Sequence, residues 1–228
     1  MINPLQHKKL YYLIGLNDAS CVVAPADSII EVGYDSPKSK QSNIIAVKYC
    51  NLFDEKNSGK LGPYLINTDT ARDYGEGVID PTGEGWNTNI TNQAMKAVDQ
   101  TFEYVEWDNP DAYNVQDILK VYDLMEHHYG LKCIAKNPLL MGNGAVKIIQ
   151  HPNVWGCIVE WDEDLGTHVV NEMYSLLAKA NRQLPIWFVN FGRSAKTQAE
   201  FLEKRIKIDS DMYSCYASKG EYKNCIQI

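Results

Sequence analysis

Short apolar runs alternate with longer amphipathic stretches along most of this chain. Eight of the short runs have the length and the β-branched or aromatic content of buried strands. They are Ile29–Tyr34, Ile44–Cys50, Gly77–Asp80, Phe102–Trp107, Leu131–Lys136, Trp155–Trp161, Pro185–Phe191 and Asp211–Tyr216. Strands that alternate with helices predict a parallel sheet joined by crossover helices.

The stretches between these runs predict helices, because their apolar residues recur three and four positions apart. Asn114 is the expected N-cap of the second helix, with Asp117 three residues further on. The apolar faces consist of Ile90, Ala94, Ala97 and Val98; of Val115, Ile118, Leu119, Tyr122 and Met125; of Val169, Val170, Met173, Leu176, Leu177 and Ala180; and of Ala199, Leu202 and Ile206. The segment 54–74 has no clear period and is expected to be a long loop.

A repeated tetrapeptide bears on the architecture. Val-Glu-Trp-Asp occurs at 105–108 and again at 159–162, with one further strand-like run between the two copies. That spacing corresponds to about 27 residues per strand–helix unit, and eight such units nearly fill the chain, as in a TIM barrel. The expected fold is therefore an α/β (β/α)8 barrel in a single domain over 1–228, in which 1–28 form an N-terminal extension, an extra strand or a plug.

Composition narrows the range of partners. The formal net charge of −7 disfavours nucleic acid and anionic membranes, because a nucleic-acid binder needs a basic surface to displace counterions. No apolar run is long enough for a transmembrane helix, and no signal peptide is visible, so the compartment is left undetermined. The six cysteines show no zinc or redox spacing, and most are expected to be free buried thiols.

The segment Phe102–Tyr113 carries the most informative chemistry. An apolar, aromatic run ends there in three carboxylates and Pro110, which cannot continue a strand because it has no N–H to donate. Alternation along the strands predicts that Glu106 and Asp108 face the barrel axis, together with Lys136 and Glu160 from the next two strands. All four lie near C-terminal strand ends, where barrel enzymes place their active sites.

Two carboxylates across a pocket are the groups that glycoside hydrolysis needs, one as nucleophile or base and one as acid. Asp108 and Glu160 are the expected catalytic pair, although Asp162 or Glu163 could supply the acid instead. Aromatic rings with polar tips suit the apolar faces of sugars. The residues expected to bind substrate are Tyr34, Asp35, Asp80, Glu106, Asn109, Asp111, Tyr113, Lys136, Asn137, Trp161 and Asp162.

Other kinds of chemistry have weaker support. The five histidines avoid the predicted strand ends, and the pair His127–His128 lies at a helix end, so converging zinc ligands are not expected. A magnesium site built from Asp80, Asp108 and Glu160 is an open alternative, because hard cations take oxygen ligands. The chain has no phosphate loop, dinucleotide fingerprint or nucleophile elbow, and no cofactor or metal is expected.

The motifs EYVEWDNPDAY at 103–113 and GLKCIAKNPL at 130–139 resemble the endo-α-1,4-polygalactosaminidase family of glycoside hydrolases, family 114, and related barrel hydrolases. GVIDPTGEGWNTNI at 77–90 is similar to that family's strand ending in Asp before a helix. The resemblance implies a barrel fold and hydrolysis of an α-linked galactosamine-type polymer. It also implies a nucleophile at Asp108 and an acid/base at Glu160.

Two departures from the family pattern keep other functions open. The sixth predicted strand, Val159–Glu163, and the end of the second, Lys48–Asn51, do not match it closely. The leading hypothesis is a retaining, endo-acting glycosidase whose partner is a carbohydrate polymer. The alternatives are a non-catalytic carbohydrate-binding or structural barrel, and a metal-dependent lyase or isomerase that uses the same acids.

Overall fold

The computed structural model describes residues 3–13, 24–33, 35–53, 65–67, 77–161, 168–191, 212–218 and 221–227. Its strands are β1 (Leu10–Leu13), β2 (Ile29–Val32), β3 (Ile45–Asn51), β4 (Leu65–Asn67), β5 (Val78–Ile79), β6 (Tyr104–Asp108), β7 (Lys132–Lys136), β8 (Val154–Trp161), β9 (Ile186–Phe191), β10 (Met212–Ser218) and β11 (Glu221–Gln227). Its α-helices are α1 (Glu84–Asp99), α2 (Val115–Leu124), α3 (Ala145–Gln150) and α4 (His168–Ala180). Short helical turns cover Pro110–Ala112 and Pro138–Gly144, and α2 continues into a π-helical turn at Met125–Tyr129.

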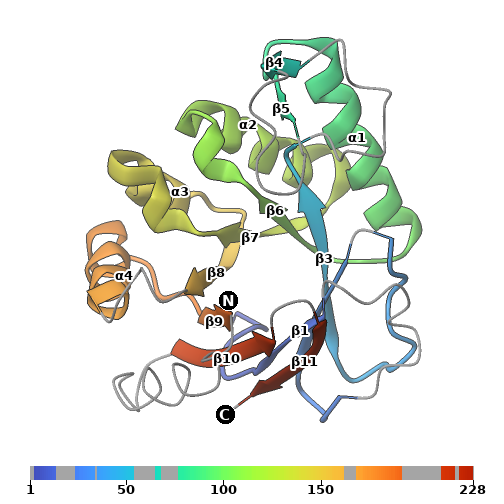
Figure 1. Ribbon diagram of the computed structural model, residues 1–228, viewed down its shortest axis with the longest axis vertical. Coiled ribbons are helices and arrows are strands. Elements are labelled where there is room, and N and C mark those ends of the chain that lie inside the picture. The colour runs from blue at the N-terminus through green and yellow to red at the C-terminus, as the bar shows by residue number, and fades with distance from the viewer. Residues whose placement is uncertain are drawn as a thin grey trace.

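The strands form a nearly closed barrel. Parallel pairings run without interruption from β1 through β2, β3, β6, β7, β8 and β9 to β10, and β11 pairs antiparallel with β10. β11 lies beside β1, which brings the two ends of the sheet together (Figure 1). The helices α1 to α4 lie outside the strands, in an arc from α1 at the upper right of the view to α4 at the left (Figure 1). The structure thus confirms the TIM-like barrel that the sequence predicts.

Two apolar clusters occupy the two sides of this wall. The outer cluster joins one set of alternating strand residues, such as Val105, Trp107 and Cys157, to the buried faces of the helices. The inner cluster contains the other set, including Tyr104 and Ile158, and fills the barrel interior. Successive strand side chains point to opposite faces, so β2, β3, β6, β7, β8 and β9 each contribute residues to both clusters. Glu106, Asp108, Lys136 and Glu160 follow the same alternation and meet inside the barrel, as predicted.

The N-terminal segment contributes more directly to the barrel than its sequence pattern indicates. β1 is a barrel strand, and Leu5, which precedes it, is buried in the inner cluster. Asn3 Nδ2 donates to the Trp155 carbonyl at 2.7 Å, and Trp187 Nε1 donates to the Lys8 carbonyl at 3.0 Å. Because Trp155 and Trp187 lie near the starts of β8 and β9, this segment covers the N-terminal end of the barrel.

One predicted strand has a different place in the fold. The run Gly77–Asp80 was expected in the barrel, but β5 within it pairs with β4 in a separate two-stranded sheet. The chain instead crosses from β3 to β6 by way of this small sheet and α1, and both β3 and β6 remain neighbours in the barrel. A short apolar run identifies a strand but does not determine which sheet it joins.

The three helices predicted within the described residues are present in the structure. Asn114 caps α2 by accepting a hydrogen bond from the Asp117 N–H at 3.1 Å. The predicted faces of α1 and α4 are buried, except that Leu177 on α4 is half-buried and Val98 at the end of α1 is exposed. The helix expected around Ala199–Ile206 lies outside the described residues. Within the described ranges, no helix has both the length and the hydropathy of a membrane span.

The strands β6 and β7 end in the same local geometry. Asn109 and Asn137, each directly before a proline, adopt left-handed conformations with φ of 62° and 42°. Asparagine tolerates this conformation better than most residues because its short side chain can bond locally. Both turns end their strand abruptly and start a helical turn, which leaves Asp108 and Lys136 as the last strand residues at the barrel mouth.

Candidate active site

A polar layer lies directly above the inner apolar cluster, on the C-terminal side of the barrel. In each of five strands the next inward residue after an apolar one is polar or ionisable, which follows from the two-residue period. The pairs are Ile29 and Glu31, Val47 and Tyr49, Tyr104 and Glu106, Ile134 and Lys136, and Ile158 and Glu160. This alternation brings side chains from separate strands into one layer at the predicted end of the barrel.

Lys136 lies at the centre of this layer. Its ammonium nitrogen is 3.0 Å from Glu160 Oε1, 3.2 Å from Glu106 Oε1 and 3.9 Å from Asp108 Oδ1. Burial alone would lower the pKa of Lys136, but the surrounding carboxylates raise it well above the ordinary value. Lys136 is therefore a permanent cation that lies between Asp108 and Glu160.

Asp108 is held as an acceptor by donors on both of its oxygens. Tyr49 donates its hydroxyl to Oδ2 at 2.8 Å, and the backbone N–H of Asn109 donates to Oδ1 at 2.8 Å. The Lys136 ammonium adds a longer ion pair. These contacts fix the orientation of both Asp108 oxygens at the barrel mouth.

Glu160 has a different set of contacts. Asn137 donates its Nδ2 to Glu160 Oε2 at 3.2 Å, and Asn137 Oδ1 accepts the backbone N–H of Glu160 at 2.8 Å. The side chain of Glu160 is 33% exposed, compared with 19% for Asp108 and 0% for Lys136. Glu160 is thus the more accessible of the two acids and the better placed to exchange a proton with a ligand or with water.

The separation of the two acids limits the chemistry they can perform. Both approach the same ammonium, so Asp108 Oδ1 and Glu160 Oε1 are at most about 7 Å apart, the sum of their two distances to it. Retaining glycosidases hold their carboxyl groups roughly 5–5.5 Å apart and inverting ones roughly 6.5–9.5 Å. This upper limit on the separation of the two oxygens includes the whole retaining range and only the lower edge of the inverting range.

A second network fixes the turn after Asp108. Asn51, at the end of β3, accepts a hydrogen bond from Asn109 Nδ2 at 2.9 Å. Gln93 on α1 accepts the Asn51 N–H at 2.8 Å and donates to its carbonyl at 2.6 Å. Asn109 was expected to bind substrate, whereas the structure uses its side chain to fasten its own left-handed turn against β3.

Glu31 belongs to the layer, although sequence reasoning did not select it. Its side chain is fully buried on β2 and lies within hydrogen-bonding reach of Glu106, which is also fully buried. Burial raises the pKa of Glu31 to about 7, and Lys136 opposes this shift. The available signal was a single carboxylate inside the apolar run Ile29–Val32, a costly position for a charge without partners.

Several residues expected to bind substrate make other contacts. Asp35 pairs with Lys96 on α1 at 2.6 Å. Asp80 accepts from the backbone N–H and the hydroxyl of Thr82 at the start of α1, and these bonds lower the pKa of its carboxyl group. Tyr113 is buried against Trp86, donates its hydroxyl to the Leu52 carbonyl at 3.0 Å and accepts the Ile79 N–H.

The remaining candidates are only partly described. Asp111 is exposed on the helical turn after β6. Tyr34, Asp162, Glu163 and the side chain of Trp161 lie outside the described residues. The choice of Glu160 over Asp162 or Glu163 as acid therefore rests on the contacts of Glu160 alone.

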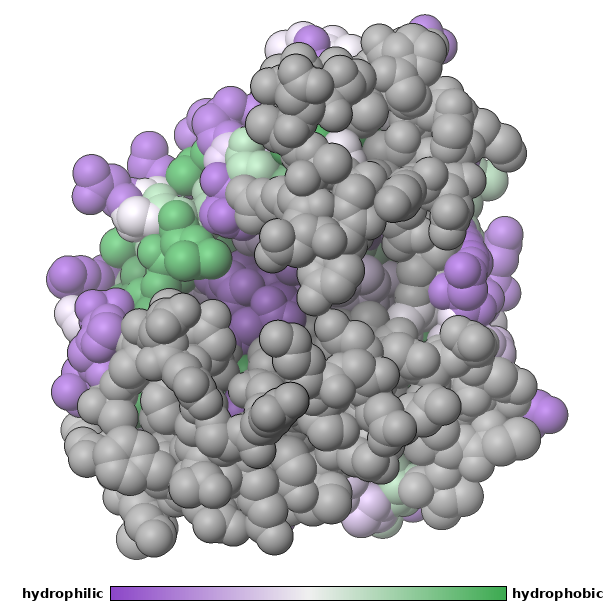
Figure 2. Space-filling view, viewed as in Figure 1, coloured by the Kyte–Doolittle hydropathy of each residue, from purple (hydrophilic) through white to green (hydrophobic). Residues whose placement is uncertain are grey.

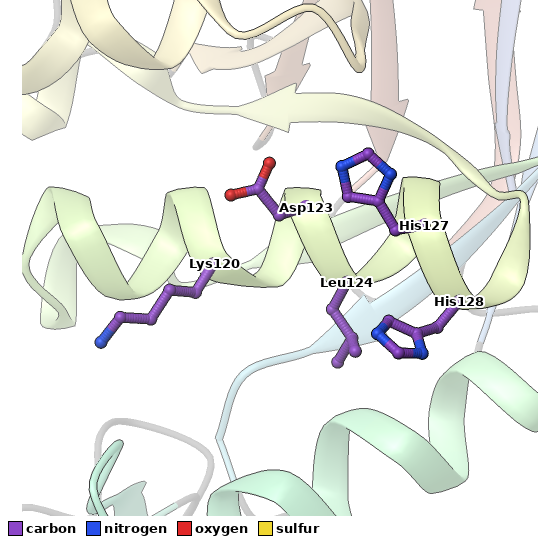
Figure 3. A pocket seen from close by; sticks show the side chains of 5 residues that line it. All are labelled: Lys120, Asp123, Leu124, His127 and His128. Atoms are coloured by element: carbon purple, nitrogen blue, oxygen red, sulfur yellow. The ribbon is translucent and has the colours of Figure 1, made fainter.

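The histidines of the second helix lie away from this layer. Figure 3 shows His127 and Asp123 on one side of the helix and His128 and Leu124 on the other, in a shallow pocket that Lys120 also lines. Asp123 accepts from His151 Nε2 at 3.1 Å, on the outside of the barrel. Among the residues that the structure describes, no group of three or more His, Cys, Asp or Glu side chains is arranged to hold a metal ion.

The surface view shows the character of the mouth. In Figure 2 the hollowed centre of the visible face, over the region of β7 and β8 in Figure 1, is hydrophilic. A hydrophobic patch borders it on the left of the view. A polar hollow beside apolar surface suits a sugar, which presents hydroxyl groups at its edge and C–H groups on its faces.

Solved structures with a similar fold include glycoside hydrolase domains. The glycoside hydrolase domain of PelA from Pseudomonas aeruginosa aligns with a TM-score of 0.66 at 12% identity, over 87% of this chain and 90% of that one. A variant of that domain with alanine in place of one glutamate aligns with a TM-score of 0.69 at 11% identity, over 97% and 98%. Aspergillus fumigatus Ega3, solved in complex with galactosamine, aligns with a TM-score of 0.65 at 11% identity, over 100% and 96%.

These similarities extend over nearly the whole of each chain, and they confirm the predicted resemblance to glycoside hydrolase barrels at the level of the fold. Neither a protein-family model nor a curated protein matches the sequence. A shared barrel does not by itself carry an activity, because one barrel fold hosts many chemistries.

Proposed function

We propose that this protein is a retaining, endo-acting glycoside hydrolase that cleaves an α-linked, galactosamine-type polysaccharide. Asp108 is the nucleophile and Glu160 the general acid and base. The observation that supports the proposal is the shared ammonium of Lys136, which limits the separation of the two carboxylate oxygens to about 7 Å at the barrel mouth, a limit that includes the retaining range.

The two acids have the different environments that their two roles require. Asp108 accepts hydrogen bonds on both oxygens and would attack the anomeric carbon as an anion, forming a covalent glycosyl-enzyme. Glu160, which is more exposed, would protonate the departing glycosidic oxygen and then remove a proton from the water that releases the product.

The amino-sugar preference has two kinds of support. The chain carries a formal charge of −7, and acidic proteins attract cationic polymers such as partly deacetylated galactosamine chains. One barrel of similar fold was solved with galactosamine bound, and the sequence motifs at 103–113 and 130–139 resemble a family that cleaves α-linked galactosamine.

Incubation with partially deacetylated galactosaminogalactan tests the activity. We expect mass spectrometry to detect oligosaccharides of several lengths, because an endo-acting enzyme cuts within the chain. Proton NMR of the first products should show the α-anomer before mutarotation, which is the signature of retention. Products of the β-anomer would contradict the retaining assignment.

Substitutions separate catalysis from binding. Asp108→Asn and Glu160→Gln should abolish product release while leaving polymer binding intact. Glu103→Gln is the matched control, because Glu103 precedes the same strand as Asp108 but is exposed near the opposite end of the barrel. If the wild-type protein binds the polymer without releasing any product, the barrel is a carbohydrate-binding module and the hydrolase proposal fails.

A further inference from the structure

The floor of the site contains two glutamates that the proposed mechanism does not use. Glu31 on β2 and Glu106 on β6 are both fully buried. Among the described residues, no group donates an aligned hydrogen bond to any of their four carboxylate oxygens. The ammonium of Lys136, 3.2 Å from Glu106 Oε1, forms an ion pair with that oxygen without such alignment.

The two carboxyl groups lie within hydrogen-bonding reach of each other. Two carboxylates cannot bond unless one of them carries a proton, and two adjacent buried charges of the same sign are unfavourable. Burial raises the pKa of Glu31 to about 7 and raises the pKa of Glu106 well above its usual range. Near neutral pH the pair is therefore expected to retain a proton.

The charges around the pair lead to the same conclusion. Glu31 and Glu106 face Asp108 on β6, Lys136 on β7 and Glu160 on β8. Cys50 on β3 is also close enough to interact, but burial raises the pKa of its thiol and keeps it neutral. Within the described part of the chain, the ammonium of Lys136 forms ion pairs with Glu106, Asp108 and Glu160. A proton on the pair leaves that ammonium available to Asp108 and Glu160.

We propose that Glu31 and Glu106 share one proton and thereby act as positioning residues, which let Lys136 hold Asp108 and Glu160 in place for hydrolysis. The catalytic half of this inference rests on the function proposed above. The shared proton itself does not, because burial and the facing carboxyl groups support it independently.

Glu31→Gln tests the positioning role by the pH profile. In the wild type, the pair loses its proton as the pH rises through about 7, and the added negative charge helps the nearby acid to keep its own proton. The amide removes that charge, so the alkaline limb of kcat/KM should move to lower pH by roughly half a unit or more. We expect KM to change little, because Glu31 is buried beneath the acids and does not reach substrate. An unchanged pH profile would overturn the positioning role.

A measurement on the wild-type chain tests the proton without requiring activity or a foldable variant. With ¹³C-labelled glutamate side chains, one carboxyl resonance should titrate near pH 7, far above the roughly 4.3 of an ordinary glutamate. That resonance should be absent from Glu31→Gln and preserved in the exposed control Glu103→Gln. If every glutamate of the wild type titrates in the ordinary range, no proton is shared and the inference is wrong.

The two measurements distinguish the possible failures. A titration near pH 7 in a protein that hydrolyses nothing would leave the shared proton standing, and it would remove both the proposed function and the positioning role. Hydrolysis with an ordinary titration of every glutamate would remove the shared proton and leave the proposed function intact.

Discussion

The hydroxyl of Tyr49 on β3 donates a 2.8 Å hydrogen bond to Oδ2 of Asp108 on β6. In the strand register Tyr49 lies opposite Glu106, two residues before Asp108, so its side chain reaches along the barrel axis toward the mouth. The bond connects neighbouring strands and fixes one oxygen of the proposed nucleophile, while the Asn109 N–H fixes the other. Asp108 is thus oriented by a neighbouring strand and by the turn that follows its own strand.

Tyr49→Phe should lower kcat/KM by roughly 10- to 100-fold, because a hydrogen bond to a charged group contributes about 1.5–3 kcal/mol. The phenyl ring keeps the packing, so the free energy of unfolding should change much less. Steady-state hydrolysis of the polysaccharide measures the effect. Tyr129→Phe, on the π-helical turn outside the barrel, is the matched control and should retain full activity. Equal activity of both variants would show that the bond does not position Asp108.

Lys136→Met should destabilise the fold in a pH-dependent way. Removing one partner of a buried ion pair leaves uncompensated charge and costs about 3–5 kcal/mol. We expect a loss of that order in the free energy of unfolding at pH 8, where the remaining acids are ionised. At pH 5 the buried glutamates can bind protons instead, so the loss should be smaller. Urea titrations at the two pH values measure the difference, and an equal loss at both would contradict the proposed charge balance.

Two substitutions at Asn109 distinguish the contribution of its backbone conformation from that of its side-chain hydrogen bond. Asn109→Gly keeps the left-handed turn but loses the bond to Asn51, whereas Asn109→Ala loses the bond and also strains the backbone. The alanine variant should therefore be less stable than the glycine variant by about 1–2 kcal/mol. Chemical denaturation measures this gap. The alanine variant should also lose more activity than the glycine variant, because the turn supplies the N–H that holds Asp108. Alanine being as stable as glycine would refute the strain.

Lys48 should make stability rise with pH in the alkaline range. It lies on the outer side of β3, donates to the Ser36 carbonyl at 2.6 Å and to Gln100 Oε1 at 2.7 Å, and is buried. Burial, followed by the charge of Lys96, lowers the pKa of Lys48 to about 8 in the folded protein. Between that value and the unfolded value of about 10.4, the unfolded chain binds more protons, so folding becomes more favourable as the pH rises.

Unfolding titrations of the wild type and Lys48→Met between pH 7.5 and 10 isolate this contribution. The wild type should gain stability relative to the variant over that range, since methionine has no proton to release. Parallel curves for the two proteins would show that the ammonium is not disfavoured in the fold.

The alternation of side chains along the strands made the inner layer predictable. Glu106, Lys136 and Glu160 could be assigned to the barrel interior because the two-residue period leaves one choice once Val105 and Val159 face the helices. The strand at Gly77–Asp80 was misplaced because a short apolar run carries no information about its partner. The bond between Asn109 and Asn51 joins residues far apart in the sequence, and only the folded barrel brings them together.

Glu31 shows a different limit of sequence reasoning. A glutamate within Ile29–Val32 resembles a solvent-facing position in an ordinary strand, and its partners lie on β6, β7 and β8. The cost of burying it becomes visible only when those strands close around the same axis. Its role could have been suspected from the apolar residues on both sides, but its partners could not have been named.

The lysine at the barrel centre has a practical consequence for trapping a bound oligosaccharide. The proposed catalytic groups also connect neighbouring strands of the barrel. Truncating one of them to alanine therefore removes a structural contact as well as a reactive group. Crystals of an inert enzyme with its ligand are therefore best sought with amide replacements, which keep the shape of the side chain. Such isosteric substitutions should prevent bond cleavage and leave the barrel around the ligand intact.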